Sequence, residues 1–386
     1  MPPSVQPVDL YRIGGPTVWP AAPGSYSFSS IASVERCPQQ WQLLHAQYGD
    51  RLGFPSRPSA PAVEGQLIHE GLESLFRACA LAGMPTVGSP AFIEVMGALG
   101  LVGLLRAMMG EREKRIAGHP RGAGFRFRHS AAQLANEVIR LFRQQYQPQN
   151  TGPLVLQPAP PGSLPPASLL QTLRALKALP EVKVTHPTLP FMGVIDLVRD
   201  GPAGVVISDF KTGQPSSTHE HQLLAYAVLW WRVTGEAPAT VEIVYPASTV
   251  SKAITVAALE QAETLLKQRV ASTAAMLAAQ PGQAKTGDHC RHCDVRQFCS
   301  DYWATTTAPK SGDWLDVAAT VVGTKGVAGV DITWAGGSAH LVFQPGTPAA
   351  RRLPDAGGIL RILGAKRVAP DVFELAPATE VFLVGP

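Results

Sequence analysis

Two neighbouring apolar segments carry two aspartates and one lysine, and the two aspartates lie at equal distances from the turn between the segments. Asp196 lies in the first segment, and Asp209 and Lys211 close the second. Residues 200–204 between them read Asp-Gly-Pro-Ala-Gly, a turn-forming cluster, so we predict two antiparallel strands joined as a hairpin. A turn centred near Pro202 places Asp196 opposite Asp209. Because side chains alternate along a strand, Lys211 projects on the same face as Asp209.

Two carboxylates that face each other across a strand pair repel, which drives one of them towards protonation. A divalent cation removes that penalty, and hard cations such as Mg²⁺ and Mn²⁺ favour carboxylate oxygens. The alternative is a solvated strand face without function, which fits poorly between such apolar flanks. The hairpin therefore predicts a metal site with an ammonium group beside it.

Two helical segments carry further polar pairs at a spacing of four residues. Residues 65–73 read Gly-Gln-Leu-Ile-His-Glu-Gly-Leu-Glu, which places His69 and Glu73 on one helix face. A lone histidine on a helix is more often structural than a ligand. Gln222 and Tyr226 share a face in the same way, on a helix that follows the hairpin. The spacing allows both pairs to look towards the carboxylates.

Together these stretches resemble the RecB-type nucleases of the PD-(D/E)XK superfamily. Residues 193–196 match the family's GxxD, and residues 209–213, Asp-Phe-Lys-Thr-Gly, match its DxKTG. Residues 65–73 match GxxxHxxLE, and the glutamine and tyrosine of the second helix match QxxxY. The resemblance covers about residues 26–303. It implies an α/β fold with a restriction-endonuclease-like core, in which helices flank a mixed central sheet.

The resemblance also implies a role for each matching residue. The metal ligands that it implies are His69, Asp196, Asp209 and the backbone carbonyl of Phe210. The catalytic residues that it implies are Asp196, Asp209, Lys211, Gln222 and Tyr226. In such a site the lysine orients a metal-bound water and offsets developing negative charge, while the Gln-Tyr pair holds the substrate strand.

Three of the five cysteines are grouped as in a metal site, and Cys37 is the best candidate for a fourth ligand. Cys290, Cys293 and Cys299 fall within ten residues, and Cys37 precedes a proline far upstream. Thiols so grouped are good ligands for soft metals, and a fourth completes the coordination. The pattern resembles the iron-sulfur subset of the same nucleases, seen in AddB-type and CRISPR-adaptation enzymes. That resemblance implies a [4Fe-4S] cluster.

Zinc is the alternative metal, with His289 or His292 replacing a thiol. The fifth cysteine, Cys79, lies in an apolar helix and is expected to be a buried free thiol. A clip from Cys37 to Cys299 closes a very long loop, so we predict that it staples both ends of the nuclease domain together.

The composition indicates ordered domains. Of 386 residues, 45% are apolar and 16% charged, and 36 Gly and 35 Pro indicate many loops. The net charge of +4 is compatible with a polyanionic partner but does not establish one. An odd number of cysteines argues against a secreted disulfide framework. No leader-like segment begins the sequence, and the most apolar run, residues 95–105, predicts a buried helix, so we expect a cytoplasmic protein without membrane contact.

Three regions are predicted along the chain: an irregular arm at 1–25, the nuclease domain with its iron-sulfur clip at 26–303, and a small β-domain at 313–386. A Pro-rich segment at 147–166 reads as a connector or an insertion. Helices are expected near 29–44, 64–82, 90–117, 130–147, 167–179, 219–233 and 256–280. Further strands are expected at 181–187 and 240–246.

Residues 313–386 show short apolar alternations between Gly, Pro and Asp turns, at 314–322, 339–343, 359–363 and 380–384. Some five short strands predict an all-β, barrel-like domain, and oligonucleotide-binding (OB) barrels are one such class. Its candidate DNA-binding residues are Arg351, Arg352, Arg361, Lys366 and Arg367. A solvated barrel face or a protein-docking module explains the same basic pattern.

The function implied is a Mg²⁺- or Mn²⁺-dependent deoxyribonuclease. We expect an exonuclease that prefers single strands or free ends, in DNA repair, recombination, CRISPR adaptation or phage defence. No GxxxxGK[ST] loop occurs, so any unwinding would come from a helicase or another protein partner. The alternative is a non-catalytic DNA-binding or scaffold subunit of a helicase-nuclease or defence complex, which the intact motif residues disfavour.

Overall fold

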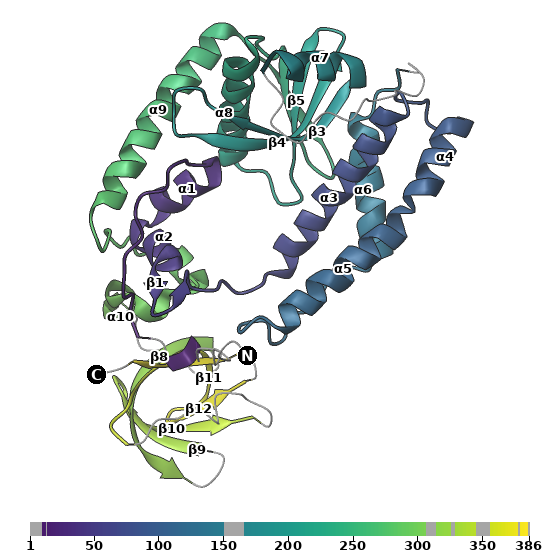
Figure 1. Cartoon of the computed structure of the whole chain (residues 1–386). Helices are drawn as coiled ribbons and strands as arrows, with labels where there is room; N and C mark the ends of the chain where they lie inside the picture. The colour runs from purple at the N-terminus through teal and green to yellow at the C-terminus, as the bar shows by residue number, and fades with distance from the viewer. Residues whose placement is uncertain are drawn as a thin grey trace, which may run out of the picture.

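The structure is a computed structural model of the chain (Figure 1). It describes residues 10–12, 14–149, 166–305, 314–325, 329–344, 356–376 and 379–384. Most of the predicted Pro-rich segment, and the candidate DNA-binding residues Arg351 and Arg352, lie outside the described residues. The described part forms a helix-flanked sheet at one end and a small β-domain at the other.

A five-stranded sheet forms the centre of the larger part. Its order is β3-β4-β5-β6-β7. The strands are Ala178–Thr185, Met192–Gly201, Gly204–Phe210, Thr240–Val244 and Thr249–Ala253. β5 and β6 run parallel and the other neighbours antiparallel, so the sheet is mixed, as predicted. The hairpin pairs Gly201 with Gly204 and Leu197 with Ser208, which brings the next two residues, Asp196 and Asp209, opposite each other.

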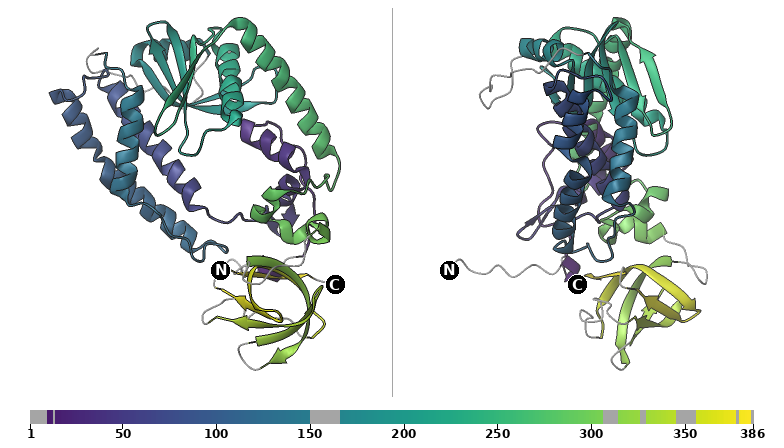
Figure 2. Two further views of the ribbon diagram at one scale, coloured as in Figure 1. Left: turned by 180° about the vertical axis from the view of Figure 1, so that it is seen from behind. Right: turned by 90° about the vertical axis from the view of Figure 1, so that its right-hand side faces the viewer.

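Helices cover both faces of this sheet (Figures 1 and 2). One face carries α3 (Ala60–Leu81), α4 (Pro90–Leu99), α5 (Leu101–Ala117) and α6 (Ala131–Gln145). The other carries α1 (Phe28–Arg36), α7 (Pro166–Leu176), α8 (Ser217–Thr234) and α9 (Val256–Ala278). Each layer buries its own hydrophobic core, with Phe210 of β5 facing the first and Ile207 facing the second.

The single helix expected near residues 29–44 is two helices, α1 and α2 (Pro38–His45). Cys37 separates them in an extended conformation with φ of −162°, because a proline disfavours helical backbone at the preceding residue. The Cys37 sulfur accepts the backbone N–H of Gln40 at 3.4 Å and so caps α2. The break therefore leaves this thiol at a helix start, beside free backbone N–H groups.

The helix expected at 90–117 is also divided. Gly100 ends α4 in a left-handed conformation with φ of 54°, which glycine adopts without strain. The combined segment Pro90–Ala117 is long and apolar enough to cross a membrane, judged by length and composition alone. A single segment of this kind is weak evidence for a membrane span.

The prediction of a buried helix at 95–105 is wrong for most of that stretch. Only Leu101 and Leu105 are fully buried there, and α4 has no fully buried residue. The reason is that α4 packs at the outer edge of α3 and α6, through partly buried side chains such as Phe92.

The C-terminal domain is a small β-barrel, as predicted. Its strands are β8 (Trp314–Lys325), β9 (Gly329–Trp334), β10 (Gly337–Phe343), β11 (Ile359–Ala369), β12 (Val372–Leu375) and β13 (Glu380–Val384). Five of them close in the order β8-β9-β10-β12-β11 and back to β8, while β13 adds to β11. The sequence prediction did not include β9 and β12.

The barrel packs against the end of the larger part that carries α2 and the C-terminal cysteines. One hydrophobic cluster spans the junction, with Phe54 and Val295 on one side and Phe382 on the other. Beside it the buried guanidinium of Arg121 donates to both carboxylate oxygens of Glu380, at 2.6 and 2.8 Å. Removing either partner would leave a buried unpaired charge at a cost of about 3–5 kcal/mol, so both residues are needed at this junction.

Candidate active site

The hairpin brings the two predicted aspartates together with the lysine. Lys211 Nζ lies 2.7 Å from Oδ2 of Asp209, and Asp209 is only 1% exposed. Asp196 accepts the backbone N–H of Phe210 at 2.7 Å, which holds its carboxylate against the end of β5. Two acids and one ammonium group therefore share a patch at the ends of β4 and β5.

Helix α3 adds His69 to this patch. Its Nδ1 lies 3.5 Å from Oδ1 of Asp196. One turn earlier, Gly65 lets α3 approach the loop that follows β5, since an added Cβ would stand 3.3 Å from Oγ1 of Thr212. The glycine of the predicted GxxxHxxLE stretch thus sets the distance between helix and hairpin.

A further acid, Glu181 of β3, lies in the same cluster and was missed by the sequence prediction. One potential ligand atom from each of His69, Glu181 and Asp196 lies within 4.8 Å of the others. Glu181 occupies the position opposite Asp196, between two ladder pairs of β3 and β4. Its φ of 51° departs from strand geometry, and such outliers gather at functional sites. Only the β3–β4 register places it here, and residue spacing alone does not determine that register.

Burial and mutual repulsion raise the pKa values of these acids. Burial, followed by the charge of Asp196, raises the pKa of Asp209 to about 7. The same two causes raise the pKa of Glu181 to about 7. Burial would lower the pKa of His69, but the hydrogen bond and charge of Asp196 raise it. A divalent cation would replace these protons, so the oxygen and imidazole donors fit Mg²⁺ or Mn²⁺.

Replacement of Glu181 by glutamine is expected to weaken Mn²⁺ binding by about 10-fold, because the amide oxygen carries no charge for the cation. Titration calorimetry of the metal-free protein measures this directly. Glu236→Gln, at an exposed surface pair with Arg174, is the control. Equal affinities for the two variants would exclude Glu181 from the metal site.

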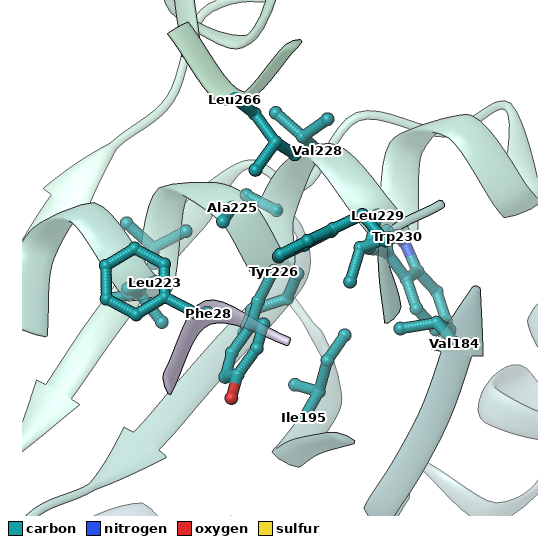
Figure 3. Close-up of a cluster of buried hydrophobic side chains, with 14 of the residues drawn as sticks. Phe28, Val184, Ile195, Leu223, Ala225, Tyr226, Val228, Leu229, Trp230 and Leu266 are labelled. Atoms are coloured by element: carbon teal, nitrogen blue, oxygen red, sulfur yellow. The ribbon is translucent and has the colours of Figure 1, made fainter. Parts of the chain in front are cut away.

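Helix α8 carries the Gln222–Tyr226 pair towards the same site. The Gln222 amide donates to the Tyr226 hydroxyl at 2.7 Å. The Tyr226 ring lies in the hydrophobic core near Phe28 and Ile195 (Figure 3). Gly193 of β4 permits this packing, because an added Cβ would stand 2.7 Å from the ring. Burial raises the pKa of Tyr226, and the negative charges of Asp209 and Asp196 raise it further. The hydroxyl therefore lies close enough to both aspartates to interact with them electrostatically.

Glu73, which the helical spacing places with His69, forms an ion pair with Arg77 one turn further along α3. Its carboxylate is therefore engaged on the helix surface. Its negative charge still contributes to the raised pKa of Glu181, so it lies at the edge of the acidic cluster.

A second cavity is lined by four of the five cysteines, Cys37, Cys290, Cys293 and Cys299. Backbone N–H groups donate at 3.4 Å to three of these sulfurs, those of Cys37, Cys290 and Cys299. Burial raises the pKa of the fourth, Cys293, to about 11, and the neighbouring Cys37 adds to the shift. Four converging soft donors with N–H···S contacts fit an iron-sulfur cluster, and they also fit zinc.

Of the remaining candidate ligands, His289 lines the cavity and His292 and Cys79 do not. His289 also lines the cavity, with Nε2 3.9 Å from the Cys290 sulfur. His292 instead accepts a hydrogen bond from Nε of Arg291 at 3.1 Å. Cys79 lies fully buried in the core between α3 and the sheet, where burial raises its pKa to about 11. The fifth thiol is thus a free core cysteine, as the apolar helix around it predicts.

Three of the basic barrel residues that were predicted to bind DNA are described, and they differ in burial and in the groups they contact. Arg361 lies over the Trp303 ring, 5.4 Å from its centroid, and donates to a carbonyl of the cysteine-bearing segment. Arg367 lies over the Trp334 ring at 5.6 Å, and Lys366 beside it is half-buried. Arg361 therefore helps to hold the barrel against the cysteine-bearing segment.

The mixed sheet flanked by helices presents two aspartates and a lysine at the end of its central hairpin, and such carboxylates suit a divalent metal. The model of the PD-(D/E)XK nuclease superfamily matches residues 25–300, and the chain belongs to that superfamily. Membership implies nuclease activity that uses a divalent metal.

No curated protein matches the chain. Among solved structures, the chain is similar to a murine DNA binding protein bound with double-stranded DNA, at 8% identity and a TM-score of 0.17. That match covers 54% of this chain and 95% of the murine chain. Similarity at this level has no bearing on function.

Proposed function

We propose that the chain is a deoxyribonuclease that hydrolyses phosphodiester bonds with Mg²⁺ or Mn²⁺. The observation that carries the proposal is the ion pair of Lys211 with the buried Asp209, beside three potential metal ligands grouped within 4.8 Å. A site that only binds a cation gains nothing from an adjacent ammonium group, which repels it. A hydrolytic site needs that group where charge develops.

The proposed ligands are His69, Glu181, Asp196, Asp209 and the backbone carbonyl of Phe210. When bound, a divalent metal polarises the scissile phosphate and lowers the pKa of a water molecule. Lys211, fixed by its 2.7 Å contact with Asp209, orients that water and stabilises negative charge in the transition state. The hydrogen-bonded Gln222 and Tyr226 hold the strand in line with it.

Within the superfamily we assign the chain to the RecB type, with residues 26–303 as its nuclease domain. The support is spatial: the stretches that match GxxD, DxKTG, GxxxHxxLE and QxxxY meet around one patch. We propose an exonuclease that prefers single strands or free ends and acts in the cytoplasm. A helicase or another protein would supply the strand, in DNA repair, recombination, CRISPR adaptation or phage defence.

We propose that the four thiols of the second cavity hold a [4Fe-4S] cluster, with zinc as the alternative. Its role is structural, because Cys37 starts α2 while Cys293 belongs to the hydrophobic cluster that reaches the barrel. We further assign the barrel to the OB class. A three-stranded meander, β8-β9-β10, closed by the hairpin β11-β12 through a parallel β10–β12 pair, is the connectivity of such barrels.

A nuclease assay on anaerobically purified protein tests the function. Single- and double-stranded DNA, labelled at either end, is incubated with Mg²⁺, Mn²⁺ or EDTA. We expect cleavage with either metal, none with EDTA, and a faster reaction on single strands. Stepwise shortening from one end would identify an exonuclease and its polarity. Folded, metal-loaded protein that leaves every substrate intact would contradict the proposal and favour a non-catalytic scaffold subunit.

A further inference from the structure

A short loop between α5 and α6 has a composition suited to nucleic acid, and it takes no part in the metal site. Residues 125–129 read Phe-Arg-Phe-Arg-His. Proteins bind single strands through aromatic rings that stack on bases and cations that contact phosphates. Alternating aromatic and arginine side chains offer both kinds of contact in one segment.

Glu64 of α3 fixes the C-terminal end of this loop. The carboxylate is 2% exposed. It accepts the backbone N–H groups of Arg128 and His129 at 2.6 and 3.0 Å, and contacts the ring Nδ1 of His129 at 2.9 Å. The guanidinium of Arg128 adds contacts at 3.1 Å. One buried carboxylate thus binds four groups of the loop and ties it to the helix that carries His69.

The N-terminal end is fixed by a buried arginine and two glycines. Arg121 donates to the backbone carbonyls of Pro55 and Asp294, both at 2.8 Å. A Cβ at Gly122 would stand 2.0 Å from the carbonyl oxygen of Ile116, so only glycine fits there. Gly124 has φ of +82°, a conformation that strains other residues. The loop is therefore held at both ends, which lowers the entropy lost when it binds a ligand.

Between these anchors lie the half-buried Phe125 ring and the exposed guanidinium of Arg126, whose Nη1 donates to the carbonyl of Phe125 at 2.6 Å. The rings of Phe125 and Phe127 meet edge-on with centroids 5.2 Å apart. Phe127 packs on the α3/α6 core, whereas Phe125 is half-exposed. Arg126 is exposed, and among the described residues no carboxylate pairs with it, while Glu64 balances Arg128.

The loop is anchored near the start of α3, the helix that also carries His69. Glu64 precedes Gly65, the residue at which α3 meets the loop carrying Thr212. His69 is five residues further along α3, about 7.5 Å along the helix axis. The anchored end of the loop therefore lies about one and a half turns of α3 from His69, on the same helix.

We propose that residues 122–127 form a strand-binding loop, in which Arg126 contacts a phosphate and Phe125 stacks on an unpaired base of the substrate strand. This inference rests on the proposed nuclease function and adds to it a reason for single-strand preference, because a base within a duplex cannot stack on Phe125.

Binding of a labelled single-stranded oligonucleotide tests the loop, measured by fluorescence anisotropy in a Lys211→Ala background that does not consume the strand. Arg126→Ala is expected to weaken binding and to lower the slope of log K against log salt by about 0.7, the contribution of one phosphate contact on a single strand. Phe125→Leu keeps an apolar side chain but loses stacking, and is expected to weaken binding at least about 5-fold.

Two controls make the result specific. Arg143→Ala removes an exposed arginine about 18 Å along α6 from the loop and is expected to leave binding unchanged. An abasic strand offers no base to stack, so Phe125→Leu should have no effect on its binding while Arg126→Ala still does.

Hydrolysis of a small phosphodiester, bis(p-nitrophenyl) phosphate, separates this inference from the proposed function. In the Lys211-containing protein, both loop variants are expected to hydrolyse it at the parent rate. Loop variants that bind the oligonucleotide as tightly as Arg143→Ala, in a protein that cleaves DNA, would overturn the loop assignment alone. A parent that neither binds nor cleaves DNA would overturn both.

Discussion

Replacing Lys211 by alanine is expected to lower the rate of DNA cleavage on the order of 10³-fold without unfolding the protein. The ammonium group lies 2.7 Å from the buried Asp209 carboxylate, at the place where charge develops in the transition state. Its removal leaves the metal ligands in place, so Mn²⁺ binding should persist. Cleavage of an end-labelled single strand in single-turnover conditions measures the rate.

Lys183→Ala provides the matched control, because Lys183 is an exposed lysine on β3 and its loss removes the same charge. This variant should cleave at nearly the parent rate. If Lys211→Ala retained more than about a tenth of the parent rate, Lys211 would have no catalytic role.

Asp209→Asn extends the same test to stability. The folded pKa of Asp209 is raised to about 7, so the folded protein holds a proton that the unfolded chain has lost above about pH 4. The stability of the metal-free parent therefore falls as pH rises from about 4 to 7. Asparagine removes this cost, so the metal-free variant should be inactive but unfold at a higher temperature than the parent at pH 8. A lower unfolding temperature would show that the carboxylate stabilises the metal-free fold.

Replacing Cys290 by serine is expected to have the largest effect on stability. Loss of one of four ligands should remove the visible colour of the proposed cluster and lower the melting temperature by at least about 5 °C. The effect reaches the barrel, because the clip segment makes contacts to it. Arg296, between Cys293 and Cys299, forms an ion pair with Asp316 of β8.

Cys79→Ser is the internal control, since this thiol is buried in the α3 core and not in the cysteine-lined cavity. It should keep the visible spectrum and the metal content. Metal analysis that finds one zinc and no iron would show that the same residues bind zinc and not an iron-sulfur cluster. Bleaching by Cys79→Ser, but not by Cys290→Ser, would show that the ligand set is wrong.

Limited proteolysis reports on the barrel in the same samples. Release of an intact C-terminal fragment from Cys290→Ser, but not from Cys79→Ser, is the expected result. Equal proteolysis of the two variants would show that the cysteine site does not stabilise the packing of the barrel.

The sequence by itself determined the features that depend on short-range geometry. Alternation along two strands and one turn sets the register of β4 and β5, so Asp196, Asp209 and Lys211 were predictable from their spacing. His69 and the Gln222–Tyr226 pair were predictable because helical spacing and the resemblance to the family motifs agree at these positions. The cysteine spacing picked out the four thiols that share a cavity, since the chemistry of grouped thiols is independent of the fold around them.

Only the tertiary structure decided what depends on contacts between distant segments. Glu181 joins the site through the register of β3 against β4, which no turn fixes because a loop separates the strands. The loop at 122–129 gains its position from Glu64 and Arg121, whose partners lie 64 to 259 residues away in the chain. The exposure of α4 follows from where the core ends. Hydrophobic burial and buried ion pairs join residues that are far apart in the sequence. A pattern of residue types does not specify which distant residue each side chain contacts.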